Sequence, residues 1–303
     1  MKKIKVAVIG VGSLGAVHAK IYSGLDGIEL IGVCDNNRDR LKQVENDLGV
    51  RGYEDYRQLL GVADAASIVV PTQDHHRIAR DFLNSDTHLL VEKPITQTVE
   101  EADELLKKAE SKNLTLAVGH VERFNAAIEA ILKIKGDIKF AECHRLGPFS
   151  PRVKDIGVVL DLMIHDIDIL LWLIKSPIKT IDAVGVKVLT RHEDIANARI
   201  VFENGAVCNI TASRVTEKAM RKIRLFQPNA YISLDYIRQE AAIYTKKLAG
   251  IVSEQIDIKK ENPLRKELSA FLNCVRTGEK PLASGREGKQ ALTVALEILK
   301  KIS

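Results

Sequence analysis

A run of glycines near the start of the chain has the spacing of a phosphate-binding loop. Gly10, Gly12 and Gly15 follow the pattern G-x-G-x-x-G, directly after an apolar run and at the start of a helical pattern. In such a loop the first glycine permits the tight turn, the second lets a pyrophosphate approach the main chain, and the third lets the helix pack closely on the strand. With Ser13 and Leu14 between them, these glycines predict a dinucleotide-binding loop, whose helix offers N–H groups to the phosphates.

An acidic residue stands where such a dinucleotide site needs one. Asp35 ends the second apolar run, 20 residues after Gly15, and is expected to accept hydrogen bonds from the adenosine ribose hydroxyls. Its carboxylate would repel a 2′-phosphate, so the expected cofactor is NAD rather than NADP. Arg38 argues for the opposite preference, because its guanidinium could face the adenine or a 2′-phosphate. The alternative is a cluster of turn glycines followed by a helix-capping acid.

The tripeptide Glu92-Lys93-Pro94 directly follows an apolar run at residues 89–91. Ligands of open parallel sheets bind at the carboxyl ends of the strands, so Glu92 and Lys93 are expected beside the cofactor. Pro94 restricts Lys93 to an extended conformation and allows a cis peptide bond between the two residues. The Lys93 ammonium would then donate a hydrogen bond or a proton to a substrate oxygen. The alternative is a solvated lysine at the end of a strand.

A second polar group lies in an otherwise apolar helical pattern at residues 158–174. Asp161 and His165 are four residues apart, and His165 and Asp168 are three apart, so an α-helix would place all three on one face. Burying unpaired carboxylates is costly, which indicates a use for them. Asp161 is expected to orient His165, which then acts as an acid or base near neutral pH. The alternative is a helix N-terminal acid beside a core histidine.

The elements that must position these groups follow two different patterns. Up to about residue 120, short apolar runs alternate with helical patterns, which predicts an α/β domain with a doubly wound parallel sheet. The expected strands are residues 5–9, 30–34, 67–70, 89–91 and 115–118. The expected helices are residues 14–23, 38–48, 76–84 and 99–111, the last with Thr98 and Glu101 as a capping box.

The remainder of the chain predicts a second domain with an open, mainly antiparallel sheet. Strand-like segments succeed one another with turn signals such as Glu203-Asn204-Gly205 between some of them. The expected strands are residues 180–189, 198–202, 206–211, 221–226, 230–234, 241–244 and 252–258, and the expected helices are 125–135, 158–174, 263–277 and 287–302. We therefore expect domains at residues 1–120 and 121–303, with both closing helices in the second domain.

Composition argues against several classes of protein. The 303 residues are 46% hydrophobic and 28% charged, with a formal net charge of +5. No long Lys/Arg run and no interleaving of aromatic and basic residues occurs, so no nucleic-acid partner is expected. No apolar stretch reaches the length of a membrane span, so no membrane partner is expected. The cysteines predict free thiols in a reducing, cytoplasmic compartment and no CxxC-type metal site; they are Cys34, Cys143, Cys208 and Cys274.

The three motifs together resemble the glucose–fructose oxidoreductase/inositol dehydrogenase/MocA (GFO/IDH/MocA) family over nearly the whole chain. The resemblance implies an NAD-binding Rossmann domain and a C-terminal α/β domain, whose open sheet often makes a homodimer or homotetramer interface. It implies that Lys93, Asp161 and His165 form the catalytic group and that Glu92 lies near the nicotinamide ribose. Pro71, Thr72 and His75 match the family's loop after the fourth strand, which lines the cofactor. The family's asparagine is replaced by Thr72, a departure from the common pattern.

Two segments are similar to nucleotide-sugar dehydrogenases of this family, residues 119–125 and 145–154. They imply an activity like that of UDP-N-acetylglucosamine 3-dehydrogenase. The residues expected to bind substrate are Arg123, Asn125, Arg152, Lys154 and Asp168. Arginine suits a diphosphate, and Arg145 is a further candidate for facing it. The alternative is that these charges are solvated on the surface.

The hypothesis that follows is a reversible oxidation of a secondary alcohol. His165 would remove the hydroxyl proton and Lys93 would stabilise the developing alkoxide, while NAD takes the hydride. An alternative substrate class is inositol or a simple sugar, which would need no anion-binding residues. An alternative of another kind is a non-enzymatic dinucleotide-sensing regulator. Such a regulator would not need Lys93, Asp161 and His165 together, so their joint presence favours an enzyme.

Overall fold

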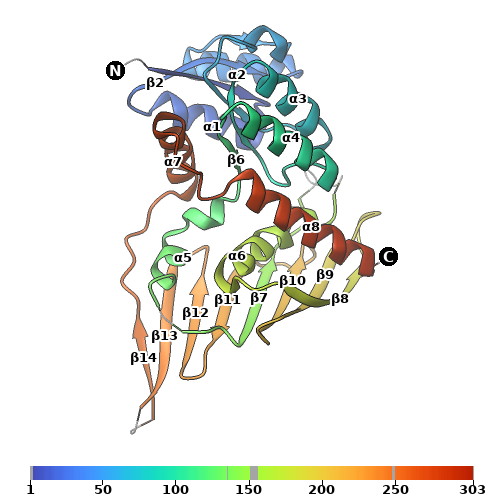
Figure 1. The fold of residues 1–303 in the computed structure, drawn as a ribbon, viewed down its shortest axis with the longest axis vertical. Coiled ribbons are helices and arrows are strands. Elements are labelled where there is room, and N and C mark those ends of the chain that lie inside the picture. Colours follow the sequence, from blue (N-terminus) through green and yellow to red (C-terminus); the bar gives the residue numbers. More distant parts are fainter. Residues whose placement is uncertain (1–2, 135, 151–155, 248–249, 303) are drawn as a thin grey trace. The chain divides into compact units, whose positions relative to one another are not determined.

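The computed structural model describes residues 3–134, 136–150, 156–247 and 250–302, which form two compact units (Figure 1). The first unit comprises Met1–Val121 and Leu264–Lys289, and the second comprises Glu122–Pro263 and Gln290–Ser303. The sequence placed both closing helices in the second domain. The structure instead groups the first of them, and the start of the last, with the first unit, because the chain returns to the first core.

The described part of the first unit contains a parallel sheet with the strand order β3-β2-β1-β4-β5-β6. Its strands are β1 (Ile4–Ile9), β2 (Ile28–Cys34), β3 (Gly52–Tyr53), β4 (Ala65–Ile68), β5 (His88–Val91) and β6 (Leu116–Val118). This confirms the predicted doubly wound fold. The two-residue strand β3 and the 3-10 helix η1 (Tyr56–Leu59) were not predicted, because they are too short to show a periodic pattern.

Four helices lie between these strands, and their ends agree with local sequence signals. They are α1 (Ser13–Ser23), α2 (Arg38–Leu48), α3 (Thr72–Asn84) and α4 (Val99–Ser111), and α7 (Pro263–Thr277), from much later in the chain, joins the same unit. The predicted capping box of α4 is present, with Thr98 accepting from the Glu101 amide and Glu101 accepting in return. Helix α7 buries Leu268 and Phe271 in the same core as β1, which explains why it groups with this unit.

The described part of the second unit contains an eight-stranded sheet with the order β14-β13-β12-β11-β7-β10-β9-β8. Every neighbouring pair is antiparallel except β7 and β10. The strands are β7 (Phe140–Leu146), β8 (Ile178–Val186), β9 (Ile195–Phe202), β10 (Val207–Ser213), β11 (Met220–Phe226), β12 (Ala230–Asp235), β13 (Glu240–Lys247) and β14 (Gly250–Gln255). The predicted open, mainly antiparallel sheet is therefore confirmed.

The central strand β7 was missed by the sequence analysis. Its burial alternates, with Ala141, Cys143 and Arg145 facing the core and Glu142 and His144 facing outward. The inward-facing arginine breaks the apolar pattern by which a buried strand is recognised in a sequence. Its ion-pair partners, described below, lie far away in the chain and stabilise the buried charge.

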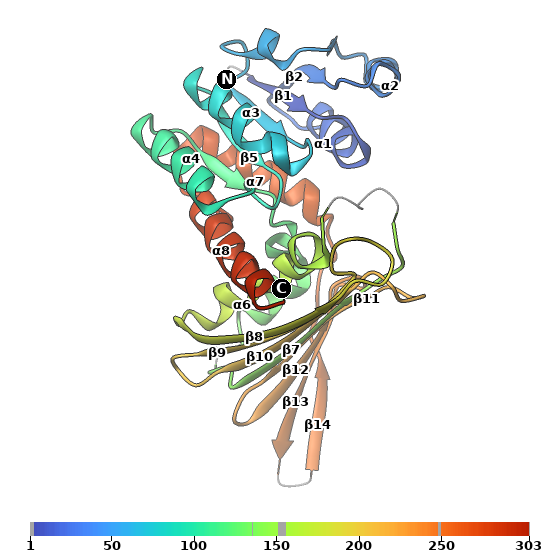
Figure 2. The ribbon, with the colours of Figure 1, turned by 90° about the vertical axis from the view of Figure 1, so that its right-hand side faces the viewer.

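Helices cover one face of this sheet (Figure 2). They are α5 (Ala126–Ile131), α6 (Ile164–Ile174) and the end of α8 (Gly285–Ile302), which contributes Ala291, Ala295 and Ile298 to the second core. No helix in the described part of the chain has the length and apolar character needed to span a membrane.

The other face carries a row of aromatic rings across four neighbouring strands. Phe140 on β7, Phe226 on β11, Tyr231 on β12 and Tyr244 on β13 stack in that order, with ring centroids 5.5, 4.8 and 5.0 Å apart. All four residues are only partly buried. This aromatic row therefore presents an apolar, ordered strip on an otherwise polar face.

Candidate active site

The glycine loop has the shape that the motif predicted. Gly10 has a φ of +88°, and a Cβ atom there would lie 2.4 Å from the carbonyl oxygen of Val69. A Cβ atom on Gly15 would lie 1.8 Å from the carbonyl oxygen of Gly10. Around Gly12 the space is open, with the Arg40 guanidinium nearest, at 4.0 Å from a built Cβ atom. The protein's own packing thus explains Gly10 and Gly15, and the open space at Gly12 leaves room for a ligand to approach the main chain.

Asp35 lies directly after β2 and ties this strand to the glycine loop. One carboxylate oxygen accepts a hydrogen bond from the Val11 amide and the other from the Asn37 amide, both at 2.8 Å. The side chain of Asn37 caps α2 by accepting from the Arg40 amide. The carboxylate is therefore held at the carboxyl edge of the sheet, where the sequence placed it.

Two arginines follow Asp35 at the start of α2, Arg38 and Arg40. Arg38, the predicted cofactor-binding residue, is largely exposed and forms an ion pair with Glu54 at 2.9 Å. Arg40 was not singled out from the sequence, yet its guanidinium is the group that lies nearest the open side of Gly12. Its position two residues into a helix that faces the glycine loop is the signal that would have identified it.

The loop after β4 is braced by a buried histidine. Pro71 precedes α3, and Thr72 is its first residue. The two ring nitrogens of His75 lie 2.9 Å from the carbonyl oxygens of Val70 and Pro94. Burial lowers the pKa of His75, so the neutral ring donates to one of these carbonyls at a time. The contacts give His75 a bracing role beside the Glu-Lys-Pro corner.

The Glu-Lys-Pro corner directly follows β5, and the Lys93–Pro94 peptide bond is cis. Glu92 is buried, and one of its oxygens accepts a hydrogen bond from the Lys93 amide at 3.2 Å. The other oxygen lies 3.4 Å from the Nε2 atom of His18 on α1. A Cβ atom on Gly119 would lie 2.6 Å from that same oxygen. Glu92 therefore turns inward and fixes the main chain of Lys93.

The buried pair of His18 and Glu92 keeps the carboxylate ionised. Burial by itself raises the pKa of Glu92, but the hydrogen bond and charge of His18 and the charge of Lys93 outweigh it and lower that pKa. The sequence analysis missed His18, although it stands three residues after Gly15 on the helix that the glycine loop opens. This pair links the glycine-loop helix to the lysine corner.

Replacing His18 by alanine is expected to destabilise the protein by about 3–5 kcal/mol, because it leaves the buried Glu92 carboxylate without its partner. Urea unfolding at neutral pH measures the loss. His76→Ala is the matched control, since it breaks a more exposed histidine–glutamate pair, with Glu104 at 2.9 Å. That control is expected to cost no more than about 1 kcal/mol. Equal losses for the two variants would contradict the proposed link.

The predicted helix over residues 158–174 begins differently from expectation. A π-helical turn, η3 (Val159–Met163), precedes α6, so Asp161 lies in the π turn and His165 in the first turn of α6. The α-helical spacing that placed both on one face therefore does not apply, because a π turn is wider than an α turn. Asp161 and His165 are both partly exposed. Single π turns recur at functional sites, and the catalytic role of Asp161 and His165 stays a prediction.

Three predicted substrate-binding residues are engaged in the interior of the second unit. Arg123 donates two hydrogen bonds to the carboxylate of Asp168, at 2.8 and 2.7 Å, and its guanidinium lies over the Trp172 ring. Asn125 caps α5 and donates to Glu122 and to the carbonyl oxygen of Tyr236. All three are at least 97% buried. These residues are therefore not the solvated surface groups that the sequence left as the alternative, and substrate binding by them stays a prediction.

Arg145 also points inward rather than toward a diphosphate. It donates two hydrogen bonds to Asp166 on α6, at 2.9 and 3.0 Å, and one to Glu122 at 2.9 Å. Burial lowers the pKa of Arg145, but the charges of Asp166 and Glu122 outweigh it and raise that pKa well above the usual value. The two ion pairs of Asp166 and Asp168 fix the orientation of α6, and hence of His165.

The remaining predicted residues, Arg152 and Lys154, lie outside the described residues. Within the described ranges, no group of three or more His, Cys, Asp or Glu side chains could hold a metal ion. The first unit thus contains the glycine loop and the Glu-Lys-Pro corner, and the second unit, by itself, contains the π turn and the helix that carries His165.

Comparison with known proteins identifies the family. Residues 4–120 match the oxidoreductase family with an NAD-binding Rossmann fold, and residues 131–232 match the GFO/IDH/MocA C-terminal domain. The UDP-N-acetylglucosamine 3-dehydrogenase of Acidithiobacillus ferrooxidans is 36% identical, over 98% of this chain and 97% of that protein. A solved structure of that enzyme, GnnA, has a TM-score of 0.95 and 35% identity, covering 100% of this chain and 98% of the other.

More distant relatives include the myo-inositol 2-dehydrogenase of Thermotoga maritima, which is 25% identical over 99% of this chain and 96% of that protein. The two family models and the similarity along nearly the whole chain agree with one another. The chain belongs to the GFO/IDH/MocA family of NAD-binding oxidoreductases.

Proposed function

We propose that this protein oxidises the 3-hydroxyl of UDP-N-acetylglucosamine, or of a closely related nucleotide sugar, with NAD as the hydride acceptor. The reaction class follows from the family. The observation that carries the proposal is the joint presence of the open glycine loop, the lysine corner and the π turn with Asp161 and His165. The full-length relative at 36% identity, named as a UDP-N-acetylglucosamine 3-dehydrogenase, supports the substrate.

Three side chains carry the chemistry in this proposal. His165 removes the proton from the substrate hydroxyl, and Asp161 orients its imidazole. Lys93 stabilises the charge that develops on the substrate oxygen, from a main chain held by Glu92. A bound nicotinamide supplies the hydride acceptor. The first unit contains the fold and the loop that suit such a cofactor, since the side of Gly12 is open to a pyrophosphate.

The preference for NAD over NADP is part of the proposal. The Asp35 carboxylate is held at the end of β2 by two main-chain amides, where it would face the adenosine ribose and repel a 2′-phosphate. Arg38 is engaged with Glu54. The carboxylate is thus the better-fixed of the two opposing charges.

We also propose a homodimer or homotetramer that uses the outward face of the eight-stranded sheet. The stacked row of Phe140, Phe226, Tyr231 and Tyr244 supports this, because ordered aromatic rings are common at protein interfaces. A cytoplasmic location is supported by the cysteines, which are buried free thiols.

Mixing the purified protein with NAD and a panel of substrates tests the function by the absorbance of the reduced cofactor. The panel contains UDP-N-acetylglucosamine, UDP-glucose, free N-acetylglucosamine and myo-inositol, each also with NADP. We expect turnover with UDP-N-acetylglucosamine and NAD to have the highest kcat/KM. A higher kcat/KM with myo-inositol would contradict the nucleotide-sugar substrate and favour an inositol dehydrogenase. If no substrate of the panel led to cofactor reduction, the non-enzymatic dinucleotide-sensing regulator would be favoured.

A further inference from the structure

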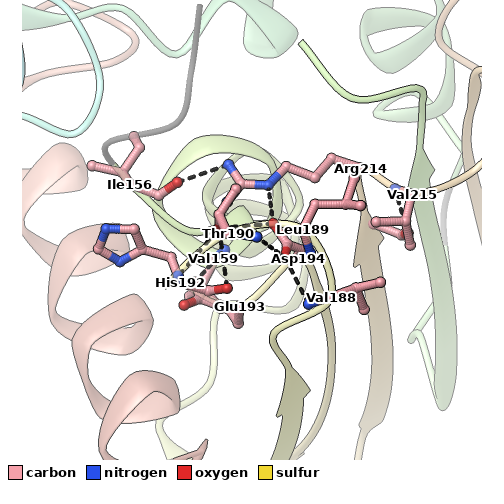
Figure 3. A network of polar contacts seen from close by, with 11 residues as sticks. Ile156, Val159, Val188, Leu189, Thr190, His192, Glu193, Asp194, Arg214 and Val215 are labelled. Atoms are coloured by element: carbon pink, nitrogen blue, oxygen red, sulfur yellow. Dashed lines mark hydrogen bonds and ion pairs between the residues drawn. The ribbon is translucent and has the colours of Figure 1, made fainter. Parts of the chain in front are cut away.

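A buried ionic network lies beside the π turn, outside the site described above (Figure 3). Its centre is Asp194, which is fully buried just before β9. One carboxylate oxygen accepts from the amides of Val188, Leu189 and Thr190, at 2.7, 2.6 and 2.9 Å. The other accepts from the Thr190 hydroxyl at 2.9 Å and from Nε of Arg214 at 2.7 Å. Burial raises the pKa of Asp194, but these donors outweigh it and lower that pKa, so the group stays charged.

Arg214 extends this network to the segment that leads into the π turn. It follows β10, is 4% exposed and donates a hydrogen bond from Nη1 to the carbonyl oxygen of Ile156 at 2.8 Å. Its other terminal nitrogen donates to the Thr190 hydroxyl, and the guanidinium lies over the Phe149 ring. The pair with Asp194 therefore fixes a guanidinium whose Nη1 atom holds the main chain of Ile156.

Glu193, the neighbour of Asp194, holds the next residues of the same segment. Its carbonyl oxygen accepts from the Val158 amide at 3.0 Å, and its carboxylate accepts from the Val159 amide at 3.1 Å. A Cβ atom on Gly157 would lie 1.9 Å from that carboxylate, so the close approach requires a glycine. Val159 begins the π turn, and the Asp161 amide donates back to the carbonyl oxygen of Gly157 at 3.1 Å.

These contacts are more than are needed to hold the loop between β8 and β9. The amides of residues 188–190 and the Thr190 hydroxyl already satisfy most of the Asp194 carboxylate within that loop. The bonds to Ile156, Val158 and Val159 instead reach a different segment, directly before Asp161. The start of a helix leaves main-chain N–H groups without helical partners, and Glu193, from outside the helix, accepts from two of them. Arg214 holds the carbonyl oxygen of Ile156 just ahead of them.

We propose that Arg214 and Glu193 are positioning residues that fix the start of the π turn and thereby place Asp161 and His165 for proton transfer. The inference rests on the proposed function, because it takes these two residues as the proton-transferring pair. Misplacing a catalytic group by about 1 Å can cost about 100-fold in rate, so a role of this kind is measurable.

The test compares Arg214→Gln and Glu193→Ala with two controls. Glu193→Gln keeps an acceptor oxygen for the Val159 amide and is expected to remain near wild type. Ile200→Ala removes a buried side chain from the same core without touching the network, so it lowers Tm alone. Assays at a temperature well below every Tm are expected to show kcat lowered about 10- to 100-fold for the first two variants only. Their NAD affinity should stay within about twofold, and the acid limb of their kcat–pH profiles should shift.

Hydrogen exchange of residues 156–163 gives a second readout that does not depend on activity. Faster exchange in Arg214→Gln and Glu193→Ala, but not in Ile200→Ala, is expected if the network holds the π turn. Unchanged exchange would overturn the anchoring. If Arg214→Gln and Glu193→Ala exchanged faster but had the same kcat and pH profile as Ile200→Ala, the positioning role would be overturned. If the wild-type protein oxidised no sugar, the proposed function would have failed, and exchange alone would decide the anchoring.

Discussion

Replacing Lys93 by methionine is expected to lower kcat by about 10²–10⁴, in line with the loss of a general acid–base or charge-stabilising group. Methionine keeps most of the length and the apolar stem of lysine but has no ammonium for the oxygen of the substrate. The corner itself should survive, because Glu92 holds the main-chain amide of residue 93, which methionine keeps. Steady-state kinetics with the best substrate of the panel, together with an NAD titration, measures the effect.

Two comparisons make that result specific. Lys112→Met removes a surface lysine of the same unit, paired with Asp86, and is expected to leave kcat unchanged. His165→Asn is expected to lower kcat by a similar factor to the Lys93 variant, while NAD affinity changes little in both. A double variant of Lys93 and His165 that kept full turnover would remove the proposed mechanism.

The second large effect is expected in the glycine loop, where two glycines should fail in different ways. Gly15→Ala places a Cβ atom 1.8 Å from the Gly10 carbonyl oxygen, so α1 must move away from the loop. We expect a clear loss of Tm, because overpacking against main chain costs roughly 1–3 kcal/mol or more. Gly12→Ala places its Cβ atom in open space, so we expect an unchanged Tm.

Gly12→Ala is expected to weaken NAD binding although it leaves Tm unchanged. Its Cβ atom would occupy the approach of the pyrophosphate, and we expect Kd for NAD to rise roughly 10- to 100-fold, where each tenfold is about 1.4 kcal/mol. Gly147→Ala is the control, since nothing lies within 4 Å of a built Cβ atom there either. Thermal melting and NAD titration of the three variants measure both properties. Unaltered NAD affinity in Gly12→Ala would contradict a phosphate site at this loop.

The elements of the first unit could be predicted because their signals are local. The strands β1, β2, β4, β5 and β6 are mostly buried and apolar, and Gly10 and Gly15 have steric reasons that lie within a few ångströms. The capping box of α4 and the corner after β5 are also contained in a few neighbouring residues. Such local patterns predict the folded structure well, because the residues that form the pattern are also the ones that contact one another in the fold.

The contacts of the charged residues could not be predicted in this way. From the sequence alone, Arg145 and Arg123 were candidates for binding an anionic substrate. In the structure each is buried against acids that lie 21 to 45 residues away in the chain. His18 and Glu92 become partners only when α1 packs beside the end of β5. A charge in a sequence does not state its partner, and a buried charge is stable only when the fold supplies one.

By itself, then, the sequence determined the alternation of strands and helices in the first unit, the glycine loop, the lysine corner and the residues of the catalytic hypothesis. The tertiary structure alone decided that β7 is a central strand, that Asp161 lies in a π turn, and that Arg214 and Glu193 hold its start. The physical reason is range: hydrophobic periodicity and glycine sterics act between neighbours in the chain, whereas ion pairs and helix ends are satisfied by whichever segments the fold brings together.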